Sequence, residues 1–380
     1  MKTPICDMLG IEFPLLAFSH CRDVVAAVTN AGGFGVLGAS SHSPEQLEHE
    51  LAWIDDQVDG RPYGVDIVCP EKFEGKGMDL TSEQIAAMVP AEHRDYVVKL
   101  LDAHGLSLDE LGSNPFSARQ TLSDSIGEKL LDVSFRHPIK LIANALGVPP
   151  QFMIDRAKAE GVPVAALVGA KEHAIKQVQA GVDVLVAQGT EAGGHCGEVT
   201  TMVLIPEVIE AIRPIRDVPV LAAGGIVTGR QVAASIALGA AGAWTGSVWL
   251  TTEEAETAPY TVQKMLGASS RDTVRSKGRT GKYSRQLKSA WTDAWTPEAN
   301  GPGALPMPLQ SILSENVLNR LDVLAEKGNQ GAQALASYWV GQGVGLMNKV
   351  RPAREVVREM IEDYLDAAER ITGSVEGGDE

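Results

Sequence analysis

Cysteine is scarce in this 380-residue chain, and so is positive charge. The four cysteines show neither CxxC nor histidine-rich spacing, which argues against a zinc motif and favours free thiols in a reducing compartment. No metal-ligand pattern is present in the sequence, and we expect no metal. The chain has 33 Lys and Arg residues and 49 Asp and Glu residues, which gives a net charge of −16. A surface of that sign repels phosphate backbones, so nucleic acid is a poor candidate for the primary partner.

Uninterrupted apolar runs are also rare. The N-terminal MKTPICDMLGIEFPLL has neither the basic start nor the long apolar core of a signal peptide, and we expect none. The stretch Ala233–Leu250 approaches the apolar density of a membrane span, but Gly239, Gly242 and Gly246 interrupt it. A helix followed by a strand explains that stretch better. We therefore expect a soluble, cytoplasmic protein without a membrane partner.

Short apolar runs alternate with amphipathic stretches along most of the chain. Each run is almost continuously apolar, as a strand buried on both faces should be. We expect eight strands, at Pro14–Ser19, Phe34–Ser40, Tyr63–Cys69, Ile139–Leu146, Pro163–Val168, Asp183–Gln188, Val218–Gly224 and Ala243–Leu250. Eight strand–helix units in roughly 250 residues predict the α/β class and a (β/α)₈ TIM barrel. A doubly wound open sheet is the alternative, because a boundary error would change the strand count.

Helix signals fill the gaps between these strands. The sequence Ser43-Pro44-Glu45 offers an N-cap, a proline in the first turn and early negative charge. Further helices are expected at Pro149–Gly161, Lys171–Gly181 and Gly229–Gly239, each ending on glycine.

Three segments lie outside this repeat. We expect an FMN-binding barrel over residues 1–252, with a helical insertion at 71–138 that is too long for a strand–helix connection. Residues 253–327 include SAWTDAWTPEANGPGALPMPLQ and are expected to form a C-terminal cap on the substrate side. Residues 328–372 are expected to return as helices packed on the barrel. They comprise the small-residue helix ASYWVGQGVGLM and the amphipathic PAREVVREMIEDYLDAAERI.

The strongest local motif follows the sixth expected strand, where the chain reads Gln188-Gly-Thr-Glu-Ala-Gly-Gly-His195. Without a Cβ, Gly193 and Gly194 allow backbone to approach a planar ligand. His195 would then lie at the C-terminal face of the barrel, where such enzymes place catalytic groups. An imidazole there can move a proton or stabilise negative charge. A structural histidine in a glycine-rich turn is the alternative.

Two glycine-containing motifs lie at the ends of the seventh and eighth expected strands. Ala223-Gly224-Gly225 ends one, and Gly246-Ser247 accompanies the other. The loops after strands 7 and 8 of such barrels often form a phosphate cradle, in which glycines let several N–H groups converge on one anion. Tight packing at strand ends is the alternative. The glycine-rich stretch Asn30–Gly38 lies before and within a strand, so a dinucleotide-binding turn is rejected there.

With these motifs the chain resembles the nitronate monooxygenase (formerly 2-nitropropane dioxygenase) family, which also includes FMN-dependent enoyl-thioester reductases. The matching pieces are NAGGFGVLGA, AQGTEAGGH, PVLAAGGI, GAWTGSVWL and VGQGVGLM. The resemblance implies FMN as cofactor and His195 as the active-site histidine. It implies that the FMN phosphate lies on Gly224, Gly225, Gly246 and Ser247. It further implies that Gln188, Gly193 and Gly194 lie along the flavin, with Gln342 and Gly343 near it.

The chain departs from the family pattern at two places. The family often has Ala-Pro-Met where this chain has Ala17-Phe18-Ser19-His20, and asparagine where Asp66 ends the third strand. Ser19, His20 and Asp66 should still face the pocket. His20 is either a second acid/base group or a cap of the helix beginning near Cys21. Asp66 either accepts a flavin N–H as a carboxylate or has a raised pKa in a dry site.

The remaining candidates are open between a functional and a packing role. Asn144 is a candidate polar substrate contact, and Cys196 is expected to be a small packing residue. Trp291 and Trp295 either line a substrate pocket or anchor the cap. A basic run in the cap forms either a solvated face or the site for a phosphate-bearing substrate such as an acyl-CoA. It comprises Lys277, Arg279, Lys282, Arg285 and Lys288.

Two oxidoreductase functions compete. The first is oxidation of an alkyl nitronate by FMN and O₂, and the second is an NAD(P)H-dependent FMN reductase of an enoyl thioester or quinone. A flavin-free barrel lyase or isomerase and a non-catalytic binding barrel are alternatives from other classes. We expect a small-molecule substrate, with a CoA thioester and NAD(P)H as candidates. The sequence is compatible with a homo-oligomer.

Overall fold

The computed structural model describes residues 2–69, 82–117 and 124–376. Its main feature is a closed barrel of eight parallel strands in the order β1-β2-β3-β4-β5-β6-β8-β9, with β9 pairing back onto β1. The strands are β1 (Leu15–Ser19), β2 (Phe34–Gly38), β3 (Gly64–Ile67), β4 (Leu141–Asn144), β5 (Val164–Val168), β6 (Val184–Gln188), β8 (Val220–Ala223) and β9 (Gly242–Thr245). The predicted TIM barrel is confirmed, and the open-sheet alternative is wrong because the sheet has no free edge.

Two apolar layers hold the barrel, because successive side chains of a strand point to opposite faces. One set points inward and fills the barrel interior, as Phe34 and Val36 of β2 do. The other set packs outward beneath the helices, as Val65 and Ile67 of β3 do. On β3 this alternation leaves Asp66 on the interior side.

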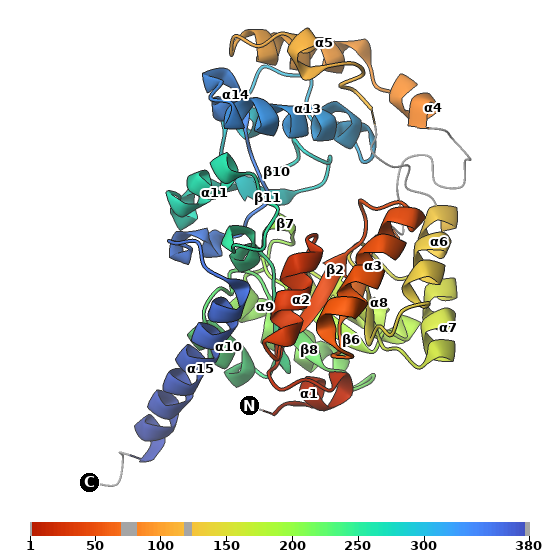
Figure 1. Ribbon diagram of the computed structural model, residues 1–380, viewed down its shortest axis with the longest axis vertical. Helices are drawn as coiled ribbons and strands as arrows, with labels where there is room; N and C mark the ends of the chain where they lie inside the picture. The colour runs from red at the N-terminus through yellow and green to blue at the C-terminus, as the bar shows by residue number, and fades with distance from the viewer. Residues whose placement is uncertain (1, 70–81, 118–123, 377–380) are drawn as a thin grey trace.

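Helices cover the outside of the barrel (Figure 1). They are α2 (Arg22–Asn30), α3 (Pro44–Val58), α6 (Asp124–Ser134), α7 (Gln151–Glu160), α8 (Lys171–Ala180), α9 (Thr201–Ile212) and α10 (Gly229–Ala237), and the short α1 (Pro4–Leu9) precedes β1. The predicted cap of α3 is confirmed, since the Ser43 hydroxyl accepts the Gln46 N–H. The insertion expected at 71–138 includes one barrel helix, because α6 packs on α3 between β3 and β4. Residues 71–81 and 118–123 of that insertion lie outside the described residues.

A second apolar cluster lies above the barrel in Figure 1. It joins the insertion to the cap through α4 (Ser82–Ala87), α5 (Ala91–Asp102), η1 (Leu108–Leu111), α12 (Ala290–Ala294), α13 (Leu309–Glu326) and α14 (Gln330–Leu335). Between this cluster and the barrel lies a small antiparallel sheet with the order β10-β11-β7. Its strands are β10 (Thr273–Ser276), β11 (Ser284–Leu287) and β7 (Gly194–His195), and α11 (Pro259–Leu266) and η3 (Ser270–Asp272) precede β10.

Two expected elements are wrong in part. The strand Ala243–Leu250 ends at Thr245, and Ser247–Thr251 forms the 3₁₀ helix η2. The segment ASYWVGQGVGLM is extended up to Gly341 and then forms the short 3₁₀ helix η4 (Gln342–Leu346). Its glycines disfavour an α-helix, and a Cβ on Gly341 would come 2.6 Å from the Glu191 carbonyl oxygen.

The chain ends in a long amphipathic helix, α15 (Ala353–Glu376), as predicted. It packs against α10 and α2 and projects beyond the barrel in Figure 1. Within the described residues, no helix combines the length and hydropathy that crossing a membrane would take.

Candidate active site

His195 lies where the barrel meets the small sheet. Directly after β6 the chain turns through residues 189–193 and enters β7, where His195 pairs with Ser284 of β11. The Gly194 backbone has φ +76°, a left-handed conformation that glycine adopts without strain. The β7–β11 pairing therefore fixes the imidazole between a barrel loop and the cap.

The environment of the His195 imidazole keeps it neutral. Burial and the nearby Lys282 ammonium lower the pKa of His195 to about 4. Its Nε2 lies 2.7 Å from the hydroxyl of Thr280, so the ring is held by a hydrogen bond from the cap. A neutral imidazole has one N–H donor and one acceptor nitrogen, and both can serve in proton transfer.

An aromatic and cationic stack supports this imidazole. The Trp339 ring centroid lies 6.4 Å from that of His195, and its indole N–H donates to the Ser284 hydroxyl at 3.3 Å. The buried Arg279 guanidinium lies 4.2 Å from the centroid of the Trp339 ring. The Arg279 side chain donates to the Ser337 carbonyl at 3.0 Å, so the stack is anchored in the protein.

Three successive backbone amides without partners among the described residues follow β8. Gly224 and Gly225 have φ +109° and +71°, which turn the chain sharply after β8. Within the described residues, the N–H groups of Gly224, Gly225 and Ile226 donate no hydrogen bond. A Cβ on Gly224 would lie 2.8 Å from the Thr201 hydroxyl, so only glycine fits there. Unpaired amides at such a turn form an anion site.

The returning segment 341–343 packs against this turn. The Gly341 N–H donates to the Ser247 hydroxyl at 2.9 Å, which leaves the Ser247 O–H free as a donor. The Gln342 N–H donates to the Glu191 carbonyl at 2.8 Å. A Cβ on Gly343 would come 3.1 Å from the Gly225 carbonyl oxygen. The structure thus brings together the predicted residues that follow β6, β8 and β9, with Gln342 and Gly343 beside them.

Gly193 and Gly194 differ in what surrounds them. A Cβ on Gly193 would lie 2.8 Å from the Gly341 N, so this glycine is required by backbone packing within the protein. A Cβ on Gly194 would meet nothing within 4 Å. Gln188, the last residue of β6, is half-buried. It follows Val184 and Val186 on the interior side of the strand.

The ends of β1 and β3 add three polar groups. The Ser19 hydroxyl accepts the Cys21 N–H at 3.1 Å at the start of α2. The His20 Nδ1 donates to the Gly38 carbonyl at 2.8 Å, so the helix-cap interpretation of His20 is wrong; the N-cap of α2 is Cys21, which has no side-chain cap bond. Asp66 is buried, with a side chain that has no hydrogen-bond partner among the described residues.

Comparison with known proteins agrees with this geometry. The family model described as nitronate monooxygenase matches residues 2–363. The protein named "Putative monooxygenase Rv1533" from Mycobacterium tuberculosis is 50% identical, over 99% of this chain and all of that protein. A "Probable nitronate monooxygenase" from Staphylococcus aureus is 28% identical over 95% of this chain and 96% of its own length. The chain belongs to the nitronate monooxygenase family.

Solved structures share the fold of this nitronate monooxygenase family member. A nitroalkane oxidase from Streptomyces ansochromogenes has a TM-score of 0.78 at 23% identity, covering 97% of this chain and 99% of that chain. FabK from Thermotoga maritima has a TM-score of 0.69 at 24% identity, covering 98% and 99%.

The predicted site residues Asn144 and Trp291 bond to backbone groups inside the protein. The Asn144 side chain is fully buried and bonds the backbone of Cys69 and the Gly147 carbonyl, so it ties two loops together. Its predicted contact with substrate has no support in this geometry. Trp291 is fully buried in the cap cluster, and its N–H donates to the Gly278 carbonyl at 3.0 Å. Of the two roles open for Trp291, the structure shows the anchoring one.

The structure also shows the surroundings of Cys196 and of the basic run 277–288. Burial raises the pKa of the Cys196 thiol, and its S–H lies 3.6 Å from the Thr190 carbonyl, which favours packing over a nucleophilic role. The run is not one solvated face, because Arg279 and Arg285 are buried. The Lys282 ammonium lowers the pKa of His195, whereas Lys288 is exposed beside Asp293.

Sequence reasoning did not find Thr280 and Trp339, whose side chains lie against the imidazole. Thr280 is 85 positions from His195 and has no motif of its own. Trp339 directly precedes the matched VGQGVGLM piece, so its position was the only available signal.

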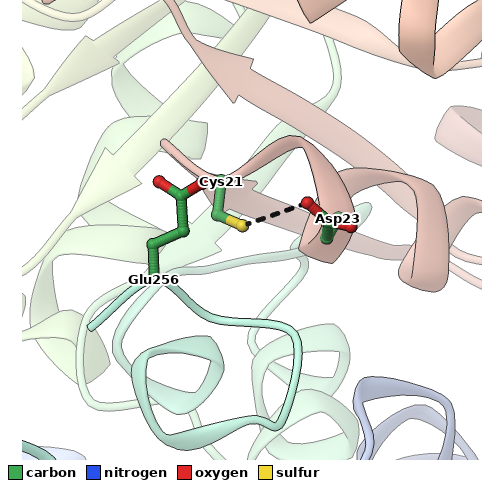
Figure 2. A group of neighbouring side chains, drawn as sticks. All are labelled: Cys21, Asp23 and Glu256. Carbon is green, nitrogen blue, oxygen red and sulfur yellow. Dashed lines mark hydrogen bonds between the residues drawn. The ribbon is translucent and has the colours of Figure 1, made fainter. Parts of the chain in front are cut away.

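A cluster of possible metal ligands lies outside this site. Ligand atoms of Cys21, Asp23 and Glu256 lie within 4.8 Å of one another, and Figure 2 shows the cluster at the start of α2. The Cys21 thiol donates to the Glu254 carbonyl at 3.0 Å. Burial raises the pKa of this thiol, and both carboxylates raise it further.

Proposed function

We propose that this protein is an FMN-dependent oxidoreductase that oxidises alkyl nitronates with O₂. The observation that carries the proposal is the group of amides at Gly224–Ile226, which have no partner among the described residues and are linked to Ser247 through segment 341–343, at the same end of the barrel as a neutral His195. Family membership supports the reaction class.

The residues present fit the phosphate of FMN. Three N–H donors and one O–H donor form a cradle suited to an anion, and a Cβ on Gly224 would clash with Thr201. Gly246 lines the same mouth, where a Cβ would meet nothing within 4 Å. Gln188 and Gly194 would lie along the ring system. When bound there, FMN would supply the redox chemistry for oxidation of the nitronate with O₂.

His195 would act on the substrate in its neutral form. The nitronate is an anion, and an imidazole N–H can donate to its developing negative charge without the cost of burying a further cation. The Thr280 hydroxyl is hydrogen-bonded to Nε2 of His195, which leaves Nδ1 as the nitrogen available to substrate. The hydrogen bond also fixes the orientation of the ring.

A second candidate is a reductase of an enoyl thioester, acyl-CoA or quinone that takes electrons from NAD(P)H. Cations around His195 favour it. Arg275 and Lys277 lie 4.9 and 4.8 Å from the ring centroid of the exposed Tyr283, and Lys282 is close enough to lower the pKa of His195. An aromatic ring flanked by cations suits a nucleotide or another phosphate-bearing substrate.

One anaerobic experiment separates the two candidates. The FMN-loaded protein is mixed with propyl nitronate, NADH or NADPH, and bleaching of the flavin absorbance is followed. The nitronate proposal predicts rapid bleaching by propyl nitronate alone. Rapid bleaching by a pyridine nucleotide and none by nitronate would replace it with the reductase. A colourless protein that binds no added FMN would reject both.

A further inference from the structure

Asp66 is an isolated polar side chain on the interior side of the barrel. It is 2% exposed, and neither carboxyl oxygen has a hydrogen-bond partner among the described residues. Its neighbours in the sheet are Gly38 of β2 and Ala143 of β4, which offer no side-chain donor. A buried polar group without a partner is costly, so its retention at the carboxyl end of a barrel strand indicates that a ligand completes it.

In the part of the chain that the structure describes, no charge of opposite sign compensates this carboxyl. Among the described residues, the loops after β1, β2 and β3 carry the imidazoles of His20 and His42 and the Cys69 thiol, and α6, which packs on β3, carries Glu128, Lys129 and Asp132. Within the described residues, no Lys or Arg contributes to its ionisation. Burial raises the pKa of Asp66 to about 8, and the nearby Ala145 amide opposes this only weakly. A carboxyl in such a site is neutral at pH 7.

We propose that Asp66 binds the polar edge of the flavin ring as a neutral carboxylic acid. A carboxylic acid pairs one O–H donor with one C=O acceptor, and the imide edge of the isoalloxazine offers the complementary C=O and N–H groups. An ionised carboxylate is an acceptor only and would repel the imide carbonyls. Asp66 therefore makes FMN affinity depend on pH. This inference rests on the proposed function, because it assumes that FMN is the ligand.

The sign of the pH dependence follows from linkage. If FMN binds the protonated form better, the bound protein takes up a proton at any pH where Asp66 of the free protein is ionised. The dissociation constant of FMN should then be flat below the pKa of the free protein and rise above it. The loss of one hydrogen bond to a buried group predicts a rise of roughly tenfold from pH 7 to pH 9.5.

The test compares the full-length wild type with Asp66→Asn. Asparagine keeps the shape and the donor–acceptor pair of the neutral acid but does not titrate. FMN is titrated into each protein across that pH range, and the quenching of flavin fluorescence gives the dissociation constant. We expect wild type and variant to agree at pH 7, and only wild type to weaken at pH 9.5. Because FMN itself titrates equally in both, the ratio of the two constants isolates Asp66.

A second measurement needs no variant and remains valid if Asp66→Asn does not fold. Calorimetry of FMN binding to the wild type in two buffers of different ionisation enthalpy gives the proton count. We expect net proton uptake near pH 9, where the FMN phosphate is already fully ionised. No uptake, or constants that rise in parallel in wild type and variant, would overturn the role of Asp66 while FMN binding stands. Failure of the wild type to bind FMN at any pH would instead overturn the proposed function.

Discussion

At the scale of single residues, the protonation state of His195 is set by its surroundings. Burial penalises the charged ring first, and the Lys282 ammonium adds like-charge repulsion, so the pKa falls to about 4. Between pH 5 and pH 8 the imidazole therefore stays neutral. Since the folded protein binds this proton less readily than the unfolded chain, acidification from pH 6.5 towards pH 4 destabilises the fold.

Substitution of Lys282 tests this electrostatic account. Lys282→Gln should raise the pKa of His195 while leaving it below 6.5, because burial is the larger cause. The measurement is an NMR titration of the imidazole resonance, assigned by its loss in His195→Asn. Lys288→Gln is the matched control, since Lys288 is exposed and pairs loosely with Asp293 at 4.0 Å. A His195 resonance that titrates near 6.5 in the wild type would contradict the assignment of a buried, neutral ring.

At the scale of elements, the amide turn after β8 depends on α10 and on the helix behind it. The Gln231 side chain accepts the N–H groups of Val227 and Thr228 and donates to the Gly225 carbonyl at 2.7 Å. Gly229, the first residue of α10, lies directly against the backbone of α15. The helix α15 thus positions α10, and the Gln231 side chain of α10 supports the candidate phosphate cradle at Gly224–Ile226.

Gly229→Ala should separate these two helices. An added Cβ would overlap the Met360 carbonyl oxygen and lie 2.5 Å from the Tyr364 N, and backbone cannot move aside cheaply. We expect a loss of about 1–3 kcal/mol and a lower Tm in a thermal melt. Gly373→Ala in the exposed end of α15 is the control, because a Cβ there meets nothing within 4 Å and alanine favours a helix. Equal melting temperatures for the two variants would show that α10 and α15 pack less closely at Gly229 than described.

At the scale of the whole molecule, the candidate site joins distant parts of one chain. The loops after β6, β8 and β9 meet the segment 341–343, and His195 is paired to the cap through β11. A ligand held by all of these parts should stabilise the fold as a unit, because it binds only the native arrangement. The net charge of −16 opposes the approach of a phosphate, so the affinity must come from local donors.

FMN should therefore raise the Tm of the ligand-free protein more than riboflavin does. At a concentration 100 times its dissociation constant, one ligand adds about 2.7 kcal/mol of stability. Riboflavin has the same ring but no phosphate, so it cannot use the unpaired amides of Gly224 and Gly225. The check is a thermal melt with each ligand at equal concentration. Equal shifts would mean that the amide turn contributes nothing to binding.

Much of the barrel was predictable because its signals are local. Eight buried strands, the Ser43 cap and the amphipathic α15 each follow from residue patterns within one segment. The extended chain before Gly341 and the 3₁₀ helix η2 were not, because contacts with other segments outweigh local pattern there. The catalytic role of His195 and the FMN contacts remain predictions that the experiments above test.

The sequence by itself determined which segments become strands and where glycine-rich turns follow them, since alternating burial and backbone freedom depend on neighbouring residues. Only the tertiary structure decided that Thr280 contacts His195, that Asn144 and Trp291 bond to backbone groups, and that Asp66 has no side-chain hydrogen-bond partner among the described residues. Such contacts join residues far apart in the chain. They depend on barrel closure and on the β7–β11 register, which no single segment specifies.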